Sequence, residues 1–313
     1  MSTRSGTGGG ESSSPPKISV IMGAYNENDE KKMRRALDSI TAQTFTSWEL
    51  IVCDDGSTDG TWDLLTRLTA ELQRHCADAR DDGFHGNSVR HDDGQGNDND
   101  RGGPKVILLR NEQNRGLAFS LNRCIEQAQG EYLARQDFDD YSEPARFALQ
   151  VQFLDTHPEY SFAGSNRRFY DDQGVWGEQV LPERPARQDF LKNSCFVHPA
   201  VMIRKADLEK AGKYTVAKVT RRAEDYELFM RMYAMGMRGY NLQDFLLHYY
   251  EGRTSYGKRK FRYRIDEIVV RFRGFRALGL FPRAIPYVFR PLFVGLVPRF
   301  VYRAHRKRQF GSA

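Results

Sequence analysis

The chain has 313 residues, of which 40% are apolar and 12% aromatic, so it can bury the core of one large α/β domain or of two smaller ones. Its formal net charge of +6 is unevenly distributed, because residues 253–308 hold 16 lysines and arginines and only two acids. Four widely spaced cysteines without a C-x-x-C pair argue against a zinc site or a disulfide framework and fit a reducing compartment. Residues 1–16 lack the apolar run of a signal peptide, and we expect a disordered tail there.

Strand and helix patterns alternate through the first half of the chain. Short apolar runs predict buried strands, and the helical spacing of Met33, Ala36, Leu37 and Ile40 predicts a helix with Asn28 as its N-cap. In chain order we expect a strand at 18–24, a helix at 28–44, a strand at 48–55, a helix at 58–72, a strand at 105–110, a helix at 115–129 and a strand at 131–137. This alternation indicates a parallel sheet with helices on both faces, and such sheets bind ligands at the carboxyl ends of their strands.

Residues 76–104 interrupt the alternation with a segment rich in Asp, Gly and Asn. It has too few apolar residues to offset the entropy of ordering, so we predict a disordered surface insertion. Its histidines and acids, among them His85 and His91, show no fixed ligand spacing, which favours a solvated loop over a metal site.

The second half of the chain is less regular. Its pattern predicts helices at 144–158 and 223–236, extended segments at 160–171 and 195–205, and a strand at 241–250. We therefore expect a main domain at 17–250 and a basic, aromatic, helical extension at 251–313.

The apolar stretch 284–302 is long enough to be considered as a membrane span. Arg290 and Arg299 would each cost about 2.5–3.5 kcal/mol inside a bilayer, and three prolines interrupt the stretch. Two interpretations remain: a segment that lies on an anionic membrane surface, or a helix packed on the protein's own core. In the first, the residues that would meet lipid are Tyr287, Phe289, Phe293, Phe300 and Tyr302.

Three groups of acids fall where a parallel sheet of this kind binds ligands. They are Asp54 and Asp55, then Asp137, Asp139 and Asp140, and finally Glu224 and Asp225 at the start of a predicted helix. Each group alone also fits a turn or a helix cap. Together they predict one cleft that holds Mn²⁺ or Mg²⁺ through carboxylates and a substrate diphosphate, because no glycine-rich phosphate loop is present.

Several motifs in one order resemble the nucleotide-sugar-dependent glycosyltransferases of family 2, which have the GT-A fold. The matching segments are "ISVIMGAYNE", "SITAQTFTSWELIVCDDGSTDGT", "NRGLAFSLN", "YLARQDFDD", "HPAVMIRK" and "AEDYELFMR". The resemblance implies a Rossmann-like, mostly parallel sheet flanked by helices, and it covers residues 17–250.

The resemblance also implies a role for each site residue. The nucleotide-sugar donor would contact Ala24, Tyr25, Glu27, Asp54, Asp55, Arg115, Gly116 and Asp137, with Asp55 at the base. Asp139 would be the direct metal ligand, with Asp137 nearer the ribose and Asp140 assisting. Asp225 would be the general base and Glu224 its orienting neighbour. His198 would touch phosphate or acceptor, although a lone histidine on an apolar strand is more often structural.

The implied reaction is an inverting transfer of a sugar, from a UDP-sugar, to a hydroxyl of a glycan or lipid-linked acceptor in surface polysaccharide synthesis. The Q-x-x-R-W motif of processive members is absent, which predicts a non-processive enzyme. We expect a cytoplasmic protein held peripherally on an anionic membrane, with no nucleic-acid partner. A sugar nucleotidyltransferase and a non-catalytic nucleotide-binding protein remain as alternatives.

Overall fold

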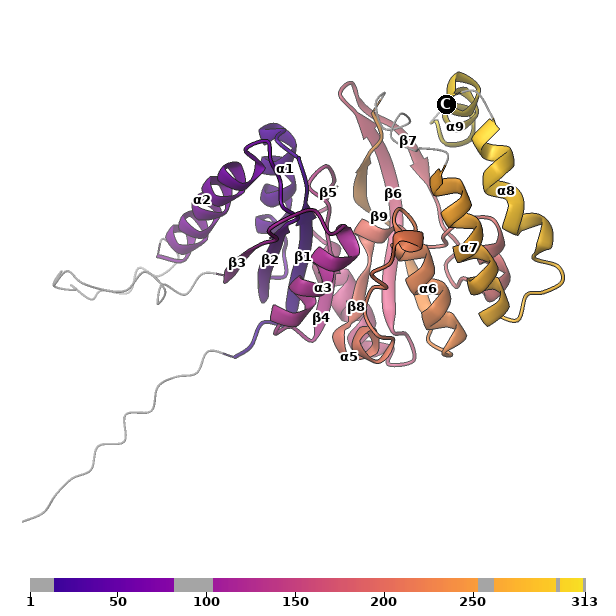
Figure 1. Ribbon diagram of the computed structural model, residues 1–313. Helices are drawn as coiled ribbons and strands as arrows, with labels where there is room; N and C mark the ends of the chain where they lie inside the picture. The colour runs from indigo at the N-terminus through magenta and orange to yellow at the C-terminus, as the bar shows by residue number, and fades with distance from the viewer. Residues whose placement is uncertain (1–13, 82–103, 253–261, 297–298, 312–313) are drawn as a thin grey trace, which may run out of the picture.

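The computed structural model describes residues 14–81, 104–252, 262–296 and 299–311 (Figure 1). The predictions for residues 1–13 and 82–103 lie outside the described residues. The expected insertion begins within a helix, because α2 (Thr61–Asp81) continues past residue 76.

Four parallel strands form the first half of one nine-stranded sheet. β1 (Ile18–Ala24) pairs with β2 (Trp48–Asp54) on one side and with β4 (Tyr132–Arg135) on the other, and β3 (Val106–Arg110) pairs with β2. β2 and β4 are buried throughout, and β1 at every residue but Gly23, as continuous apolar runs require of strands covered on both faces. The predicted parallel arrangement is confirmed for these four strands.

Antiparallel pairs enter the sheet in the second half. The remaining strands are β5 (Tyr141–Ser142), β6 (Phe162–Asp171), β7 (Gly174–Gln179), β8 (Met202–Arg204) and β9 (Gly239–Tyr250). β8 is antiparallel to both β4 and β6, whereas β9 is parallel to β6 and antiparallel to the short β5. The hairpin β6–β7 extends beyond the sheet's main path (Figure 1). The expected extended run at 195–205 is interrupted by a 3₁₀ turn at His198–Ala200, since Pro199 fits the start of a helical turn.

Helices cover both faces of the sheet and enclose two hydrophobic cores. On one face lie α1 (Glu30–Thr41), α2 and α4 (Arg146–Thr156). On the other face lie α3 (Leu117–Gln127), α5 (Lys205–Lys210) and α6 (Glu224–Ala234).

The buried side of α1 is the predicted one, but its N-cap is not. Met33, Ala36, Leu37 and Ile40 are buried, as their spacing indicates. The cap is Asp29, whose carboxylate accepts a hydrogen bond from the Lys32 backbone N–H at 3.2 Å, and the prediction of Asn28 was wrong by one residue.

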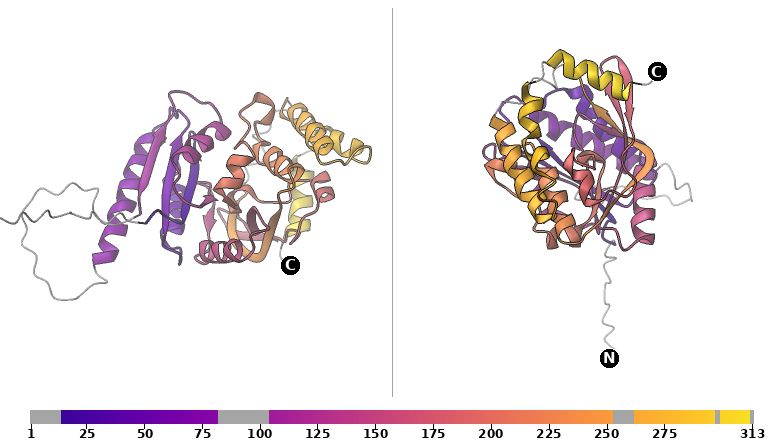
Figure 2. Two further views of the ribbon diagram at one scale, coloured as in Figure 1. Left: turned by 90° about the horizontal axis from the view of Figure 1, so that it is seen from below. Right: turned by 90° about the vertical axis from the view of Figure 1, so that its right-hand side faces the viewer.

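Three helices form the C-terminal extension, as predicted: α7 (Arg262–Ala277), α8 (Ile285–Leu296) and α9 (Arg299–Phe310). They cover the end of the molecule opposite α1 and α2 (Figure 2). α7 packs on α6 and α8, and α9 packs on β7. The centroid of the Phe310 ring on α9 is 5.4 Å from that of the Phe169 ring on β6. Among the helices in the described ranges, none combines the length and apolarity needed to cross a bilayer.

A buried arginine at the start of α4 fastens this helix to the end of β4. The Arg146 guanidinium is fully buried and donates to the side chains of Gln136, Ser142 and Gln150 at 2.8–3.1 Å, and to the backbone carbonyl of Arg135 at 2.8 Å. Burial lowers the pKa of Arg146 to about 9. These bonds hold the chain on both sides of residues 137–140.

Arg146→Met should therefore lower the free energy of unfolding by about 3 kcal/mol or more, because it leaves several buried acceptors without a donor. The measurement is chemical denaturation, with the exposed Arg187→Met as the matched control. Equal losses in the two variants would contradict the structural role of Arg146.

Candidate active site

The acids that follow β4 form a compact cluster. Carboxylate oxygens of Asp137, Asp139 and Asp140 lie within 4.8 Å of one another, a group that can hold a metal ion. Asp137, Phe138 and Asp139 line a cleft of about 940 Å³, and the Phe138 side chain also packs into the core on the α1 side of the sheet. These residues form the turn that follows β4, which ends at Arg135.

This cluster carries a large electrostatic cost. Burial, and next the charges of Asp137 and Glu27, raise the pKa of Asp139 to about 7. Burial, and next Asp139 and Asp137, raise the pKa of Asp140 well above its usual range. Two contacts oppose this effect: Arg135 forms an ion pair with Asp137, and the Tyr250 backbone N–H donates to Asp140 Oδ1 at 2.8 Å.

The cluster fits a hard divalent cation. The second oxygen of Asp140, Oδ2, is buried and has no hydrogen-bond partner among the described residues, so it is available as a ligand. Carboxylate oxygens are the ligands that Mg²⁺ and Mn²⁺ prefer, and a cation here would offset the repulsion among the three acids.

A second cavity of about 600 Å³ adjoins the cleft and is lined by Ala24, Tyr25, Asp55, Arg115 and Gly116. Residues of β1 and of α6 line both cavities, so the two meet between these elements. All five of these residues were predicted to contact the donor, and the fold brings them to one place.

The carboxylate of Asp55 organises the loop before α3. It accepts hydrogen bonds from the backbone N–H groups of Arg115 and Gly116 at 2.9 and 2.7 Å, and from the Asn111 side chain at 2.7 Å. Gly56 has a φ of +69°, and a Cβ there would lie 2.6 Å from the backbone of Gln113, so the two loops pack without side chains between them.

Asp54 lies apart from both cavities. It is fully buried, accepts a hydrogen bond from the Ser57 backbone N–H at 3.2 Å and is 3.4 Å from the Arg110 guanidinium. These contacts stabilise the turn after β2, and its predicted donor contact stays a prediction.

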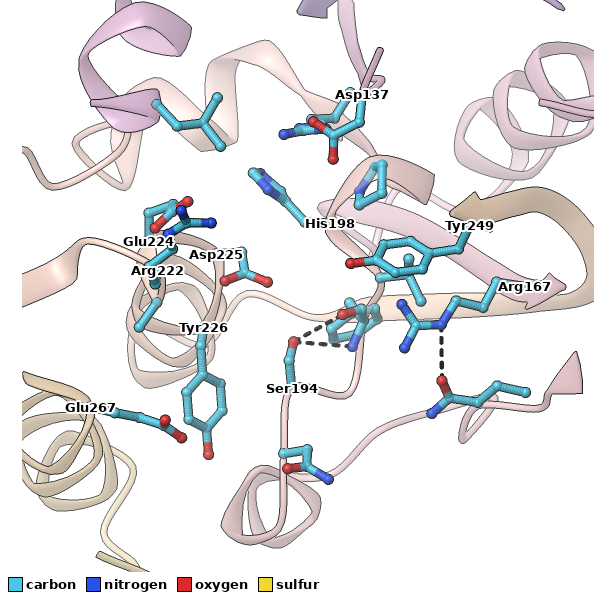
Figure 3. Close-up of a pocket in the computed structure, with 18 of the residues that line it drawn as sticks. Asp137, Arg167, Ser194, His198, Arg222, Glu224, Asp225, Tyr226, Tyr249 and Glu267 are labelled. Carbon is cyan, nitrogen blue, oxygen red and sulfur yellow. Dashed lines mark hydrogen bonds and ion pairs between the residues drawn. The ribbon is translucent and has the colours of Figure 1, made fainter. Parts of the chain in front are cut away.

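The acids of the third group, Glu224 and Asp225, occupy the first turn of α6 and line the larger cleft. Asp225 projects into the cavity (Figure 3). Burial and the neighbouring Asp225 raise the pKa of Glu224 to about 7. Arg222, just before the pair, has a φ of +68°, a strained value for a residue with a side chain, and it lines both cavities.

His198 lies between Asp137 and the Glu224–Asp225 pair in Figure 3. Its Nε2 is 2.7 Å from the Tyr214 hydroxyl, and burial lowers its pKa well below the usual range. The imidazole is therefore neutral near pH 7. It packs against Tyr214 and also lines the cleft, so the structural and the ligand-contacting interpretations are compatible.

The sequence profile of glycosyl transferase family 2 matches residues 19–88 and 93–212. Among curated relatives, the putative glycosyltransferase EpsE of Bacillus subtilis is 35% identical over 296 residues, which are 94% of this chain and 95% of that protein. The chain belongs to glycosyl transferase family 2.

Two further similarities support this assignment. WfaP of Escherichia coli, named a UDP-Glc:alpha-D-GlcNAc-diphosphoundecaprenol beta-1,3-glucosyltransferase, is 26% identical over 245 residues, or 78% of this chain and 81% of its own length. The crystal structure of TarS 1–349 of S. aureus in complex with UDP has a TM-score of 0.58 at 19% identity, covering 90% of this chain and 76% of that one. The predicted GT-A fold is confirmed, and the chain is a glycosyltransferase.

Several residues that line this glycosyltransferase's cleft were not singled out from the sequence, among them Arg135, Arg167 and Tyr249. Arg135 had a signal, because a charged residue inside the buried run "YLAR" requires a partner. Arg167 and Tyr249 lie on β6 and β9, far apart in the sequence, and only the pairing of these strands brings them together.

Asp139→Asn should stabilise the metal-free enzyme. The raised pKa of Asp139 means that the folded state binds more protons than the unfolded chain between the ordinary value of 3.8 and about 7, so stability falls as the pH rises through this window. The variant cannot ionise, and we expect its thermal midpoint at pH 8 in EDTA to rise by a few degrees and its pH dependence to flatten.

Calorimetry from pH 4 to 8 measures both effects, with Asp244→Asn, an exposed acid on β9, as the control. A lower midpoint for Asp139→Asn with an unchanged pH dependence would show that the acids are not in electrostatic conflict.

Proposed function

We propose that this enzyme moves a sugar from a UDP-sugar to a hydroxyl of a glycan or lipid-linked acceptor, in one metal-assisted step that inverts the anomeric centre. The observation that carries the proposal is that the acid cluster after β4 and the acids of α6 face one cleft, which meets the cavity around Asp55. The names of the relative WfaP and of the TarS–UDP complex support a UDP-sugar donor.

The donor would occupy both cavities. The nucleoside would lie in the cavity lined by Asp55, Arg115 and Gly116, and the diphosphate where this cavity meets the cleft, beside Ala24 and Tyr25. Asp137, Asp139 and Asp140 would hold Mn²⁺ or Mg²⁺, which would neutralise the charge that grows on the departing diphosphate.

Asp225 would act as the general base. It would accept the proton of the acceptor hydroxyl at a carboxylate oxygen while that hydroxyl attacks the anomeric carbon. Glu224, whose pKa is about 7, is partly protonated near neutral pH and can donate a hydrogen bond that orients the acceptor. Neutral His198 would fill the space between base and metal site without competing for the proton.

The product would be released after one addition. The sequence lacks the motif of processive members, and the far end of the cleft is lined by α9 residues, among them Gln309 and Phe310. A lipid-linked acceptor, as in the name of WfaP, would place the reaction in surface polysaccharide synthesis.

The C-terminal helices support a peripheral contact with an anionic membrane. Ile285, Phe289 and Phe293 are spaced four residues apart on α8 and are 48%, 47% and 68% exposed, so one side of this helix offers an apolar stripe to the surroundings. Val288 is buried in the core, and Tyr287 is partly buried and packs against the same core, so its contact with lipid stays a prediction. The side chains of Phe300 and Tyr302 lie outside the described part. The basic residues of the extension would meet anionic headgroups.

Asp225→Asn should lower the rate of sugar transfer by roughly 10²- to 10⁴-fold, the usual contribution of a general base. UDP binding in the presence of Mn²⁺ should stay within about twofold of wild type, because the Asp55 cavity is untouched. UDP release from a panel of UDP-sugars, with and without acceptors, measures the rate, and titration calorimetry measures binding.

The matched control is Glu227→Gln, since Glu227 lies in the same helical turn but pairs with Arg231 at 2.8 Å. Transfer at the wild-type rate by the Asp225 variant would remove this residue from the role of base. A wild-type enzyme that bound no UDP would argue against the proposed donor.

The double variant Phe289→Ser, Phe293→Ser should weaken binding to vesicles that contain anionic lipid by about tenfold or more, because burial of two phenyl rings is lost. Vesicle sedimentation at low salt measures the affinity. Met235→Ser removes a similarly exposed apolar side chain after α6 and should have no effect. Unchanged binding by the double variant would exclude α8 as the membrane contact.

A further inference from the structure

Charge is divided between the two ends of the larger cleft. Near the sheet's carboxyl edge and the start of α6, acids outnumber cations in its lining: Glu27, Asp137, Asp139, Glu224 and Asp225 against Arg135 and Arg222. Toward β6, β9 and the C-terminal helices, Glu267 is the single acid among the described lining residues. The cations there are Arg167, Lys192, Arg264, Arg271, Arg290 and Arg306.

Most of these arginines already have partners in the fold. Arg271 donates to Glu267 and to the backbone carbonyl of Leu191, and Arg290 binds the Asn193 side chain at 2.9 Å. Arg306 forms an ion pair with Glu251 at 2.5 Å. These contacts hold the C-terminal helices on the main domain. The arginines that line this end of the cleft therefore also stabilise the packing of the helices.

Arg167 differs from them in its surroundings. Its guanidinium lies between two aromatic rings, 4.6 Å from the Phe169 centroid and 4.4 Å from that of Tyr249, and its Nε donates to the Gln179 side chain at 2.9 Å. Within the described residues, no carboxylate lies at ion-pair distance from it and no hydrogen bond engages its two terminal nitrogens. Arg167 is partly buried, and burial lowers its pKa.

A side chain in these surroundings can bind an anion. A desolvated guanidinium without a counter-charge is costly, and its planar fork matches two oxygens of a phosphate. In Figure 3, Arg167 and Tyr249 lie side by side and face the cavity from the side opposite Asp225. Lys192, exposed at the edge of the same cleft, adds a second cation without an ion-pair partner among the described residues.

We propose that Arg167, with Lys192, binds the phosphate that links the acceptor sugar to a prenyl carrier. This inference rests on the proposed function, since it assumes that the donor fills the acidic end of the cleft. An acceptor hydroxyl at Asp225 would then leave its anionic group at the opposite, basic end.

The position of α8 favours a phosphate attached to lipid. This helix lines the basic end of the cleft with Arg290, Pro291 and Val294, and it exposes Phe289 and Phe293 on its outside. One helix therefore lines the basic end of the cleft and also carries the apolar stripe, so a prenyl chain that leaves the cleft along α8 would reach the membrane that the stripe contacts.

The test uses the full chain with its donor site saturated by UDP and Mn²⁺. Farnesyl diphosphate is titrated as the probe into wild type, Arg167→Gln, Lys192→Gln and the control Arg184→Gln, an arginine whose side chain is 72% exposed outside the cleft. We expect the dissociation constant to rise roughly tenfold or more in Arg167→Gln, a few-fold in Lys192→Gln and not at all in Arg184→Gln. Lys192 is exposed, so its variant remains informative if Arg167→Gln folds poorly.

UDP binding to each variant separates this inference from the proposed function. If the wild type fails to bind UDP, the proposed function fails; if all proteins bind UDP but the cleft variants bind farnesyl diphosphate as wild type does, the phosphate subsite is refuted. Equally tight binding of farnesol would refute recognition of the phosphate. Equally tight binding of inorganic pyrophosphate would refute the assignment to a lipid-linked group.

Discussion

The crowding of three carboxylates after one strand, with Asp140 buried and the other two partly buried, is the constraint on which the site depends. Asp137, Asp139 and Asp140 repel one another, and the surrounding protein compensates only in part, through the ion pair of Arg135 and the backbone N–H of Tyr250. The chain that carries these acids is held firmly in place. β4 lies in the interior of the sheet, and Arg146 binds the chain on both sides of the acids. Proteins tolerate such conflict where it serves function, and a divalent cation would convert the repulsion into ligation.

The division of charge extends this constraint across the molecule. The acidic end of the cleft comes from the loops after β1 and β4, which a doubly wound sheet directs to one edge, and from the first turn of α6. The basic end comes from β6 and from the C-terminal helices, of which α7 packs on α6 and α9 on β7. The C-terminal extension therefore lines the cleft and also forms part of the outer surface. The exposed apolar stripe on α8 and the cations of the extension differ in residue type, but both lie at the basic end of the cleft.

Much of this arrangement could be predicted from the sequence, because it follows from local patterns. Continuous apolar runs gave β1 to β4, and the acids at their ends indicated the site. The pairing of Asp55 with the Arg115 loop, the ion pair of Asp54 with Arg110 and the environment of Arg167 could not be predicted, since each depends on contacts between segments dozens of residues apart. The N-cap error at Asn28 is of a different kind: two adjacent residues both suit a cap, and only the hydrogen bond to Lys32 distinguishes them.

The most direct test of the central claim is a crystal structure of the enzyme with UDP and Mn²⁺, with the anomalous signal of manganese recorded. The account predicts one manganese peak within about 2–2.5 Å of a carboxylate oxygen of Asp139 and of a diphosphate oxygen, with uracil in the cavity beside Asp55. Bound UDP without manganese at the three acids, or with its diphosphate against Arg167, would contradict it.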